Sequence, residues 1–398
     1  MKVSRLLIAG LLFTVGCAGD FSSEKAVNEP GGGGDVTNNN NGWGNSSPPA
    51  CNPGSAPTLF DNALCVCGDL KDVGAVLVKA GTTKDPPSMG VNGTYKVINH
   101  SGIDGSLVAF NGMEAIANIE VRDDLKTNHN VNFAGRVQVG KDMMVGGNLS
   151  GVGYLDVGGT LGVAGSDGVL GGKKIGKLGG FSAVAPPCDC SPGKVLDVKA
   201  AVAQARSAND NTKAGLPQNP VNAIGVAKLI LNTGSYYLGS KASIGYTKIT
   251  VNGAVKLYID GDLDAIGHDR ISITNSSTLE LFISGDLHTV GHVLMGDKHH
   301  PAALRVYVGG SQKVTLQVGN QVFRGSLYAP GAALAYVGRT KIEGSLLART
   351  LDSVGLLELY FSRPTTDDSG KTCTPPGGSP PPKSPPDQPD PKDLPMLY

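Results

Sequence analysis

The chain has 398 residues, with 34 basic and 34 acidic side chains, so its formal net charge is zero. Because proteins that bind nucleic acids usually carry a basic face, this balance argues against a nucleic-acid partner. The 57 glycines are about twice the ordinary share of ~7%, and only 5% of the residues are aromatic. This composition favours many short strands and tight turns over a helical bundle.

Residues 1–17 form an export signal. Lys2 and Arg5 precede an apolar run that is too short to cross a hydrocarbon core of ~30 Å. A small residue then precedes Cys17, and this arrangement resembles the lipobox of bacterial lipoproteins. The resemblance implies a lipid anchor on Cys17, and Ala18 after it implies retention in the outer membrane, with the periplasmic or cell-surface side left open. The alternative is an ordinary signal peptide with a coincidental cysteine.

Two segments have compositions that cannot form a hydrophobic core. Residues 18–50 are rich in glycine and asparagine and predict a flexible tether. Residues 364–398 are rich in proline and predict a disordered tail.

Residues 51–185 predict a β-rich N-terminal part of a solenoid. The pattern Val-Gly-Gly-x-Leu occurs at 145–149 and is repeated at 157–161. Repeats too short to bury a face alone must stack on one another to form a core. Short strands are expected at 76–78, 95–98, 107–110 and 119–121.

Residues 186–222 interrupt this pattern with a cysteine-bearing turn followed by a helix. The helix is expected at 195–208, because Leu196, Val198, Val202 and Ala205 form an apolar stripe and alanines raise the helical propensity. We expect this helix to pack on the solenoid or to cap one end of it.

Residues 223–363 form the main repeat array. The sequence from Leu257 to His268 recurs from Leu281 to His292, with the same Gly-Asp-Leu in the middle. Phe323-Arg-Gly-Ser-Leu likewise recurs as Ile342-Glu-Gly-Ser-Leu. Coils of roughly 19–25 residues, with two or three short strands each, indicate a mainly β protein, a right-handed parallel β-helix with one inserted helix.

The segment Phe323 to Gly338, with 342–348, is similar to the C-terminal coils of a bacterial surface β-helix family of unknown function, often described as adhesin-like or pilus-associated. The block Pro186-Pro-Cys-Asp-Cys and the later Asn209-Asp-Asn resemble myxobacterial lipoprotein members of that family. The likeness covers roughly residues 60–363. It implies the solenoid fold, and it implies no catalytic residues and no cofactor.

Six cysteines remain after the lipobox, and in an exported protein they are expected to form disulfides. Two Cys-x-Cys pairs leave a zinc site as the alternative, although zinc sites usually have wider spacing. Six cysteines allow 15 pairings, and the sequence does not choose among them. The disulfide candidates are Cys51, Cys65, Cys67, Cys188, Cys190 and Cys373.

The repeat of Leu257 to His268 also brings together a set of possible metal ligands. His268 and His292 are expected to lie on adjacent coils, and Asp262 and Asp286 likewise. Imidazole and carboxylate groups together suit zinc or another divalent ion. The alternative is a polar ladder at a repeated turn, in which these side chains bond backbone groups.

The sequence therefore predicts a cell-envelope lipoprotein that displays a β-solenoid in a structural or adhesive role, without catalysis. Its expected partners are the membrane, through the lipid, and extracellular polysaccharide or surface proteins. One alternative is a polysaccharide-binding or polysaccharide-cleaving β-helix protein, since Asp260 and its acidic neighbours could supply paired carboxylates. Another is a self-assembling scaffold, because solenoid ends expose unpaired strand edges.

Overall fold

The computed structural model describes residues 60–81, 86–191, 193–216, 224–274, 276–291, 294–315 and 322–363. The predicted signal, tether and tail lie outside the described residues, as do Cys17, Cys51 and Cys373. No helix in the described ranges is both long enough and apolar enough to span a membrane.

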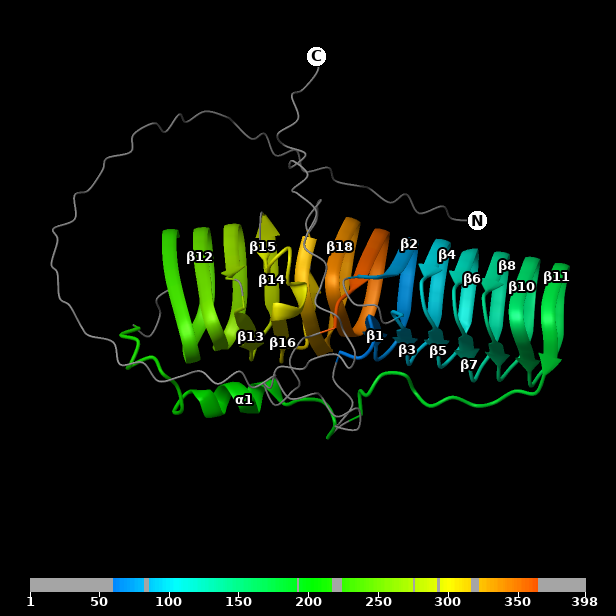
Figure 1. Ribbon diagram of the computed structural model, residues 1–398, viewed down its shortest axis with the longest axis horizontal. Helices are drawn as coiled ribbons and strands as arrows, with labels where there is room; N and C mark the ends of the chain where they lie inside the picture. Colours follow the sequence, from blue (N-terminus) through cyan, green and yellow to red (C-terminus); the bar gives the residue numbers. More distant parts are fainter. Residues whose placement is uncertain are drawn as a thin grey trace, which may run out of the picture. The chain divides into compact units, whose positions relative to one another are not determined.

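Within the described residues, every strand pairing is parallel, and 18 strands join into one continuous stack. This confirms the predicted parallel β-solenoid with a helix at its side (Figure 1). The N-terminal strands are β1 (Leu64–Val66), β2 (Leu70–Ala80), β3 (Met89–Val91), β4 (Tyr95–Ile103), β5 (Leu107–Ala109), β6 (Met113–Val121), β7 (Leu125–Thr127), β8 (Val131–Val139), β9 (Met143–Val145), β10 (Leu149–Val163) and β11 (Asp167–Gly179). The later elements are α1 (Val198–Ala205), β12 (Ile224–Ile273), β13 (Thr278–Ile283), β14 (Leu287–Gly291), β15 (Leu294–Met295), the 3₁₀ turn η1 (Pro301–Ala303), β16 (Leu304–Val308), β17 (Lys313–Thr315) and β18 (Val322–Phe361).

The N-terminal coils repeat every 18 residues, since Tyr95 pairs with Met113 and Val131 pairs with both Met113 and Leu149. Each coil has three sides. In the coil that starts at Tyr95, the first side is 95–98, the second is 100–103 and the third is β5. Side chains alternate between the core and the surface, as in β6, where every second residue is buried.

The Val-Gly-Gly-x-Leu pattern does recur in the sequence, but its 12-residue spacing does not correspond to the length of one coil. Leu149 begins the first side of its coil, whereas Leu161 lies on the third side and pairs with Met143. The two copies of Val-Gly-Gly therefore mark two different turns of the same solenoid.

Glycines form the corner between the first and second sides in the coils of Gly135, Gly153 and Gly171, whereas Asn99 and Ala117 occupy it in two earlier coils. Gly153 and Gly171 have φ values of 140° and 130°. A Cβ at Gly153 would lie 1.9 Å from the carbonyl oxygen of Gly135 on the preceding coil. Glycine is required here because the backbone bends sharply while the coils remain in close contact.

The C-terminal coils are longer and less regular. Leu257 pairs with Leu281 and Leu263 pairs with Leu287, which confirms the predicted register between these two coils. The next coil is longer by one residue, because Leu279 pairs with Leu304. Within β18 the spacing falls to 19 residues, as shown by the hydrogen bond of 2.8 Å from Ser345 Oγ to Ser326 Oγ.

The order of the coils in space differs from their order in the chain. β1 pairs with β18 on one side and with β3 on the other, through Leu64 with Leu346 and Met89. The first coil therefore lies in the middle of the stack, and the coils from β2 to β11 extend away from it in one direction (Figure 1). The chain then returns along the stack and builds β12 to β18 from the other end back to the middle.

The returning chain, residues 180–191 and 193–197, is called here the crossing segment. Asn128 on the third side exchanges two bonds of 2.8 and 2.9 Å with the backbone of Val184. Asn92 exchanges two bonds of 2.8 and 3.0 Å with the backbone of Cys188. These paired amide contacts fix the crossing segment against the third side of the N-terminal coils.

Helix α1 continues the crossing segment along the side of the C-terminal coils and does not cap an end. It is shorter than the predicted 195–208, and it begins where the side chain of Asp197 accepts a bond of 2.9 Å from the backbone N–H of Ala200. Its buried Val198 and Val202 pack on an aromatic column from successive coils. The column consists of Tyr258, Phe282, Tyr307 and Tyr328, with the first three rings stacked at 4.8 and 4.6 Å.

Candidate functional site

The two aspartates proposed as metal ligands are turn residues that bond the next coil. Asp262 Oδ1 accepts a hydrogen bond of 2.8 Å from the backbone N–H of Asp286. Asp286 Oδ1 in turn accepts one of 3.1 Å from the N–H of Gln312. The predicted stacking of these residues is confirmed, and the bonds match the polar-ladder alternative.

The same hydrogen bond, from a backbone N–H of one coil to a turn side chain of the preceding coil, recurs in the N-terminal coils. Asn130 Oδ1 accepts a bond of 2.8 Å from the backbone of Asn148, and Asn148 Oδ1 accepts one of 2.9 Å from Ser166. Asp142 Oδ1 likewise accepts one of 2.7 Å from Thr160. Asparagine or aspartate at these turns satisfies a backbone donor that the strand ladder leaves unpaired.

The histidine pair is only partly covered by the structure. Gly267 pairs with Gly291, so the backbones next to His268 and His292 are in register. The side chain of His268 and the whole of His292 lie outside the described residues. In the described ranges, no group of three or more His, Cys, Asp or Glu side chains could hold a metal ion. The metal site stays a prediction.

The central cysteines form two disulfides, Cys65–Cys188 and Cys67–Cys190. The two Cys-x-Cys pairs thus join each other in parallel, in place of the alternative zinc site. Both bonds tie the crossing segment to the coil in the middle of the stack, where β1 meets β18. Cys51 and Cys373 lie outside the described residues, so their pairing stays a prediction.

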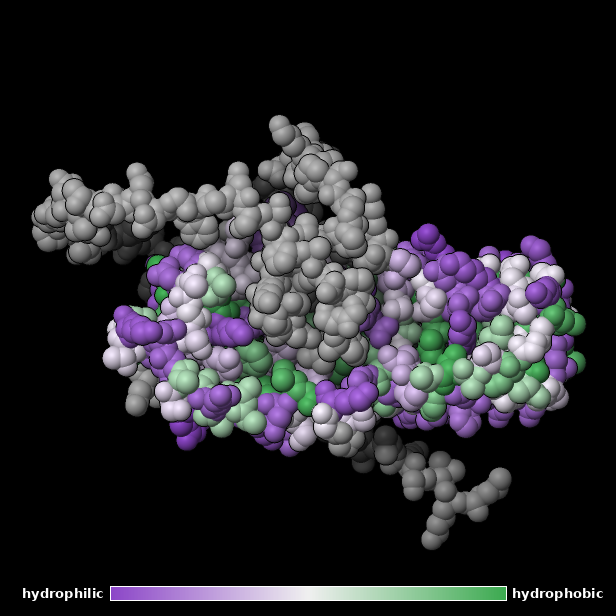
Figure 2. All heavy atoms as spheres, turned by 60° about the horizontal axis from the view of Figure 1, so that its bottom comes forward, coloured by the Kyte–Doolittle hydropathy of each residue, from purple (hydrophilic) through white to green (hydrophobic). Residues whose placement is uncertain are grey.

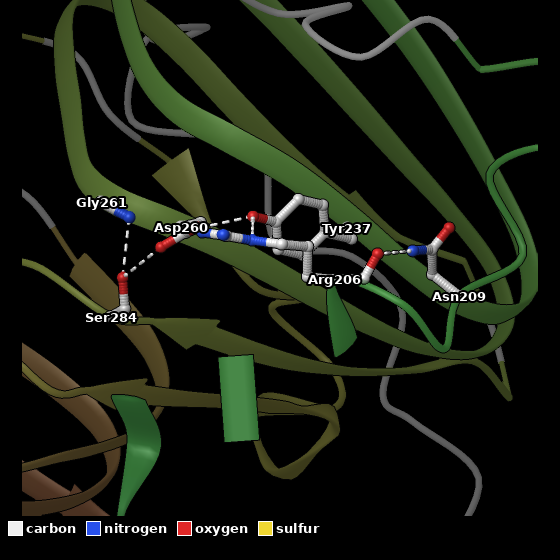
Figure 3. Close-up of polar contacts among 6 residues, drawn as sticks. All are labelled: Arg206, Asn209, Tyr237, Asp260, Gly261 and Ser284. Carbon is white, nitrogen blue, oxygen red and sulfur yellow. Dashed lines mark hydrogen bonds and ion pairs between the residues drawn. The ribbon is translucent and has the colours of Figure 1, made fainter. Parts of the chain in front are cut away.

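A densely bonded polar cluster lies on the surface at the end of α1 (Figure 3). Arg206 donates from Nε to the hydroxyl of Tyr237 at 2.9 Å and forms an ion pair with Asp260. The Tyr237 hydroxyl also donates to Asp260, and Ser284 Oγ donates to its second oxygen at 3.3 Å. The hydrogen bonds from Tyr237 and then Arg206 lower the pKa of Asp260.

This cluster fastens the helix and is not arranged as an acid–base pair. A carboxylate whose pKa is lowered by two strong donors is a weak base, so Asp260 is poorly suited to take a proton from a substrate. Asn209 also belongs to the helix end, since its Nδ2 donates to the carbonyl of Ala205 at 2.9 Å. The cluster therefore holds the C-terminal end of α1 against the coils.

A buried polar cluster lies at the joint between the two halves. Asp72 points into the core, where its Oδ1 accepts hydrogen bonds from Ser353 and, at 3.3 Å, from the hydroxyl of Tyr336. Its Oδ2 is buried and has no hydrogen-bond partner among the described residues. Burial raises the pKa of Asp72 above its ordinary value, and the two hydrogen bonds only partly offset this.

An apolar row runs along the outer surface of the first side of the N-terminal coils and continues onto the last coil of β18. Its members pair from coil to coil, so they stand in line about 4.8 Å apart. The six larger members are 46–68% exposed. We call this set the aliphatic row: Val354, Val73, Ile98, Ile116, Ala134, Val152 and Leu170.

A second line, the polar row, runs beside it on the same side and consists of Lys96, Glu114, Asn132 and Ser150. Lys96 and Glu114 form an ion pair of 2.8 Å, and Ser150 Oγ donates to Asn132 Oδ1. Between the two rows lies a groove of about 710 Å³. The groove crosses the first side from Lys96 to Leu170 and is lined mainly by apolar side chains.

The other sides of the solenoid offer less apolar surface. Residues of the second side that point outward are polar in most coils, as at Asn118, Glu120 and Gln138. The third side is covered by the crossing segment and by α1. Figure 2 shows hydrophobic residues exposed between hydrophilic ones at the end of the stack that the N-terminal coils form.

The aliphatic row was not predicted from the sequence, although a signal for it was present. Ile98, Ile116, Ala134, Val152 and Leu170 follow one another at the same 18-residue spacing as the coils. The alternation within each strand predicts these positions to be exposed, and an apolar residue recurring at exposed positions marks a contact surface.

Comparison with known proteins gives a partial match. Residues 189–362 match a family model described as Domain of unknown function (DUF7305). The matched region covers α1 and the C-terminal coils but not the coils that carry most of the aliphatic row. No curated protein matches this sequence.

One similar solved structure is an ice-binding protein from an Antarctic bacterium, Flavobacteriaceae. The two are 11% identical, and the match covers 77% of this chain and 99% of that one, with a TM-score of 0.21. At that score the likeness assigns no function to this chain.

Proposed function

We propose that this protein is a non-catalytic lipoprotein of the cell envelope, which displays a solenoid for attachment to an extended surface. The observation that carries the proposal is the aliphatic row. It is a line of exposed apolar side chains that continues over successive coils. Soluble proteins rarely leave such continuous apolar surface exposed unless something binds there.

The scaffold suits display because its parts are fastened to each other at many points. Parallel ladders continue through the joint between β1 and β18, and asparagine and aspartate side chains bond one coil to the next. Two disulfides and α1 hold the crossing segment along the side. A rigid face loses little conformational freedom on contact, so many weak contacts can add up.

The anchor in this proposal is the lipid on Cys17. One acyl chain gives only marginal membrane binding, whereas two or more chains anchor a protein stably. Incorporation of labelled fatty acid into the wild-type protein but not into Cys17→Ala supports the anchor. Equal labelling of both proteins would contradict it.

The adhesive role is tested with two matched double variants on cells that display the protein. Ile116→Lys with Val152→Lys places two charges in the aliphatic row, and Asn118→Lys with Gln138→Lys places two on the second side. We expect the first variant to lower the retention of cells on hydrocarbon-coated or polysaccharide-coated surfaces under flow several-fold, and the second to retain it. Equal retention by both variants would overturn the role of the row.

Two measurements on purified protein separate the alternatives. Release of reducing ends from a polysaccharide would replace the adhesive role with a catalytic one. Elution as a polymer in size-exclusion chromatography would replace it with a scaffold role, in which exposed strand edges such as β11 pair between copies.

A further inference from the structure

The groove on the first side repeats a similar pair of contacts over four coils, and the fifth coil has Gly168 at the polar position. One residue of the polar row lies on one edge and one residue of the aliphatic row on the other, as with Asn132 and Ala134 or Ser150 and Val152. Neighbouring coils are about 4.8 Å apart, so the groove offers this pair at about 4.8 Å intervals. A ligand that matches it must be a linear polymer with a similar repeat.

The charges of the groove cancel. Lys96 and Glu114 are its charged lining residues and are paired with each other at 2.8 Å. The remaining polar lining groups, Asn132 and Ser150, are an amide and a hydroxyl, which both donate and accept hydrogen bonds. A neutral polymer rich in hydroxyl groups complements this lining, whereas a polyanion would need an excess of basic side chains.

The dimensions argue against a second copy of the chain as the main occupant. Five coils line the groove, so it is about 19 Å long, and three residues across the first side make it about 10 Å wide. The corresponding contact area of about 190 Å² is far below the ~800 Å² per partner of a stable protein complex. The volume of about 710 Å³ instead lies in the range of ligand sites, roughly 300–1,000 Å³.

From these features we infer that the groove binds a linear, uncharged polysaccharide whose chain runs along the solenoid axis, with one sugar unit to each coil. A sugar ring in an extended chain is about as long as the spacing between strands. Its C–H groups contact the aliphatic row, and its hydroxyl groups bond the polar row. This inference rests on the proposed attachment function and names the ligand class for the same face.

The test titrates the full-length protein with neutral β-linked gluco-oligosaccharides of increasing length by isothermal titration calorimetry. We expect the affinity to rise with each added sugar until the chain fills about five coils, and then to stay constant. Acidic oligogalacturonides of the same lengths should bind more weakly. No binding at any length, equal affinity for short and long chains, or tighter binding of the acidic series would overturn the inference.

Two matched double variants then test whether oligosaccharide binding depends on the polar row, with the aliphatic row left unchanged. Asn132→Ala with Ser150→Ala removes the hydroxyl-bonding groups but leaves the aliphatic row intact, and should lower oligosaccharide affinity about tenfold. Asn118→Ala with Gln138→Ala, on the second side, should leave it unchanged. Equal affinity of both variants, or a dimer of the wild-type protein that Val152→Lys abolishes, would overturn the inference.

The two proposals fail in different ways. Attachment of cells without oligosaccharide binding would refute the inferred ligand class but leave the proposed attachment function standing. Oligosaccharide binding without any attachment of cells would remove the surface role alone.

Discussion

The two disulfides should stabilise the protein in a strongly non-additive way. Cys65–Cys188 and Cys67–Cys190 each span 123 residues. Closing a loop of that size lowers the entropy of the unfolded chain enough to stabilise the folded state by about 5 kcal/mol. Once one bond is present, the other closes only a few residues and adds about 2 kcal/mol.

Removing either bond by paired Cys→Ala substitutions should therefore cost about 2 kcal/mol, and removing both should cost about 7 kcal/mol. The free energy of unfolding is measured by urea titration, with the slope of each transition compared before midpoints are converted into energies. The two single-bond variants serve as controls for each other. A double variant whose loss equals the sum of the two single losses would refute this reasoning.

Three further predictions concern single residues. Gly153→Ala should destabilise the protein by about 1–3 kcal/mol in thermal or urea unfolding, because its φ is 140° and the new Cβ would meet a carbonyl at 1.9 Å. Gly168→Ala, with its nearest atom at 3.8 Å, should be close to neutral. Asn148→Ala should cost about 0.5–1.5 kcal/mol through the lost bonds to Ser166, and no loss would show that the turn ladders are dispensable. The raised pKa of Asp72 means that its carboxyl favours the folded state most when protonated, so stability should fall as pH rises from about 4 through the folded pKa. Asp72→Asn should lose this slope, and an unchanged slope would assign it to other groups.

The stacking in the C-terminal half could be predicted because its repeat is nearly identical in sequence. Parallel strands in register place Leu257 beside Leu281 and Asp262 next to Asp286, so the sequence repeat corresponds directly to a coil. The shorter coil of the N-terminal half was harder to find, because its equivalent positions share only apolar character, as at Tyr95, Met113 and Val131. Glycine pairs at two of the three turns, Gly146-Gly147 and Gly158-Gly159, then produced a second and misleading spacing, that of the Val-Gly-Gly-x-Leu pattern.

The order of the coils could not be predicted from patterns along the chain. A parallel ladder requires only that two coils have matching sides, so any coil can stack on any other of similar shape. Leu346 meets Leu64 although the two lie near opposite ends of the described chain, and no local pattern in the sequence marks that contact. The cysteine pairing could not be predicted for the same reason. The crossing segment lies beside the first coil only because the chain returns along the stack.

The regularity of the coils explains why the candidate binding surface is in the N-terminal half. Coils of constant length place equivalent residues in straight rows, so a single outward position that recurs once per coil becomes a continuous line from Ile98 to Leu170. The C-terminal coils differ from one another in length, and their aromatic column is buried under α1. The region that matches the family model, residues 189–362, supplies this covered half, and the line from Ile98 to Leu170 lies outside it. If a protein with the same C-terminal coils but no regular N-terminal coils still bound the neutral oligosaccharides, the groove between the two rows would not be the binding site.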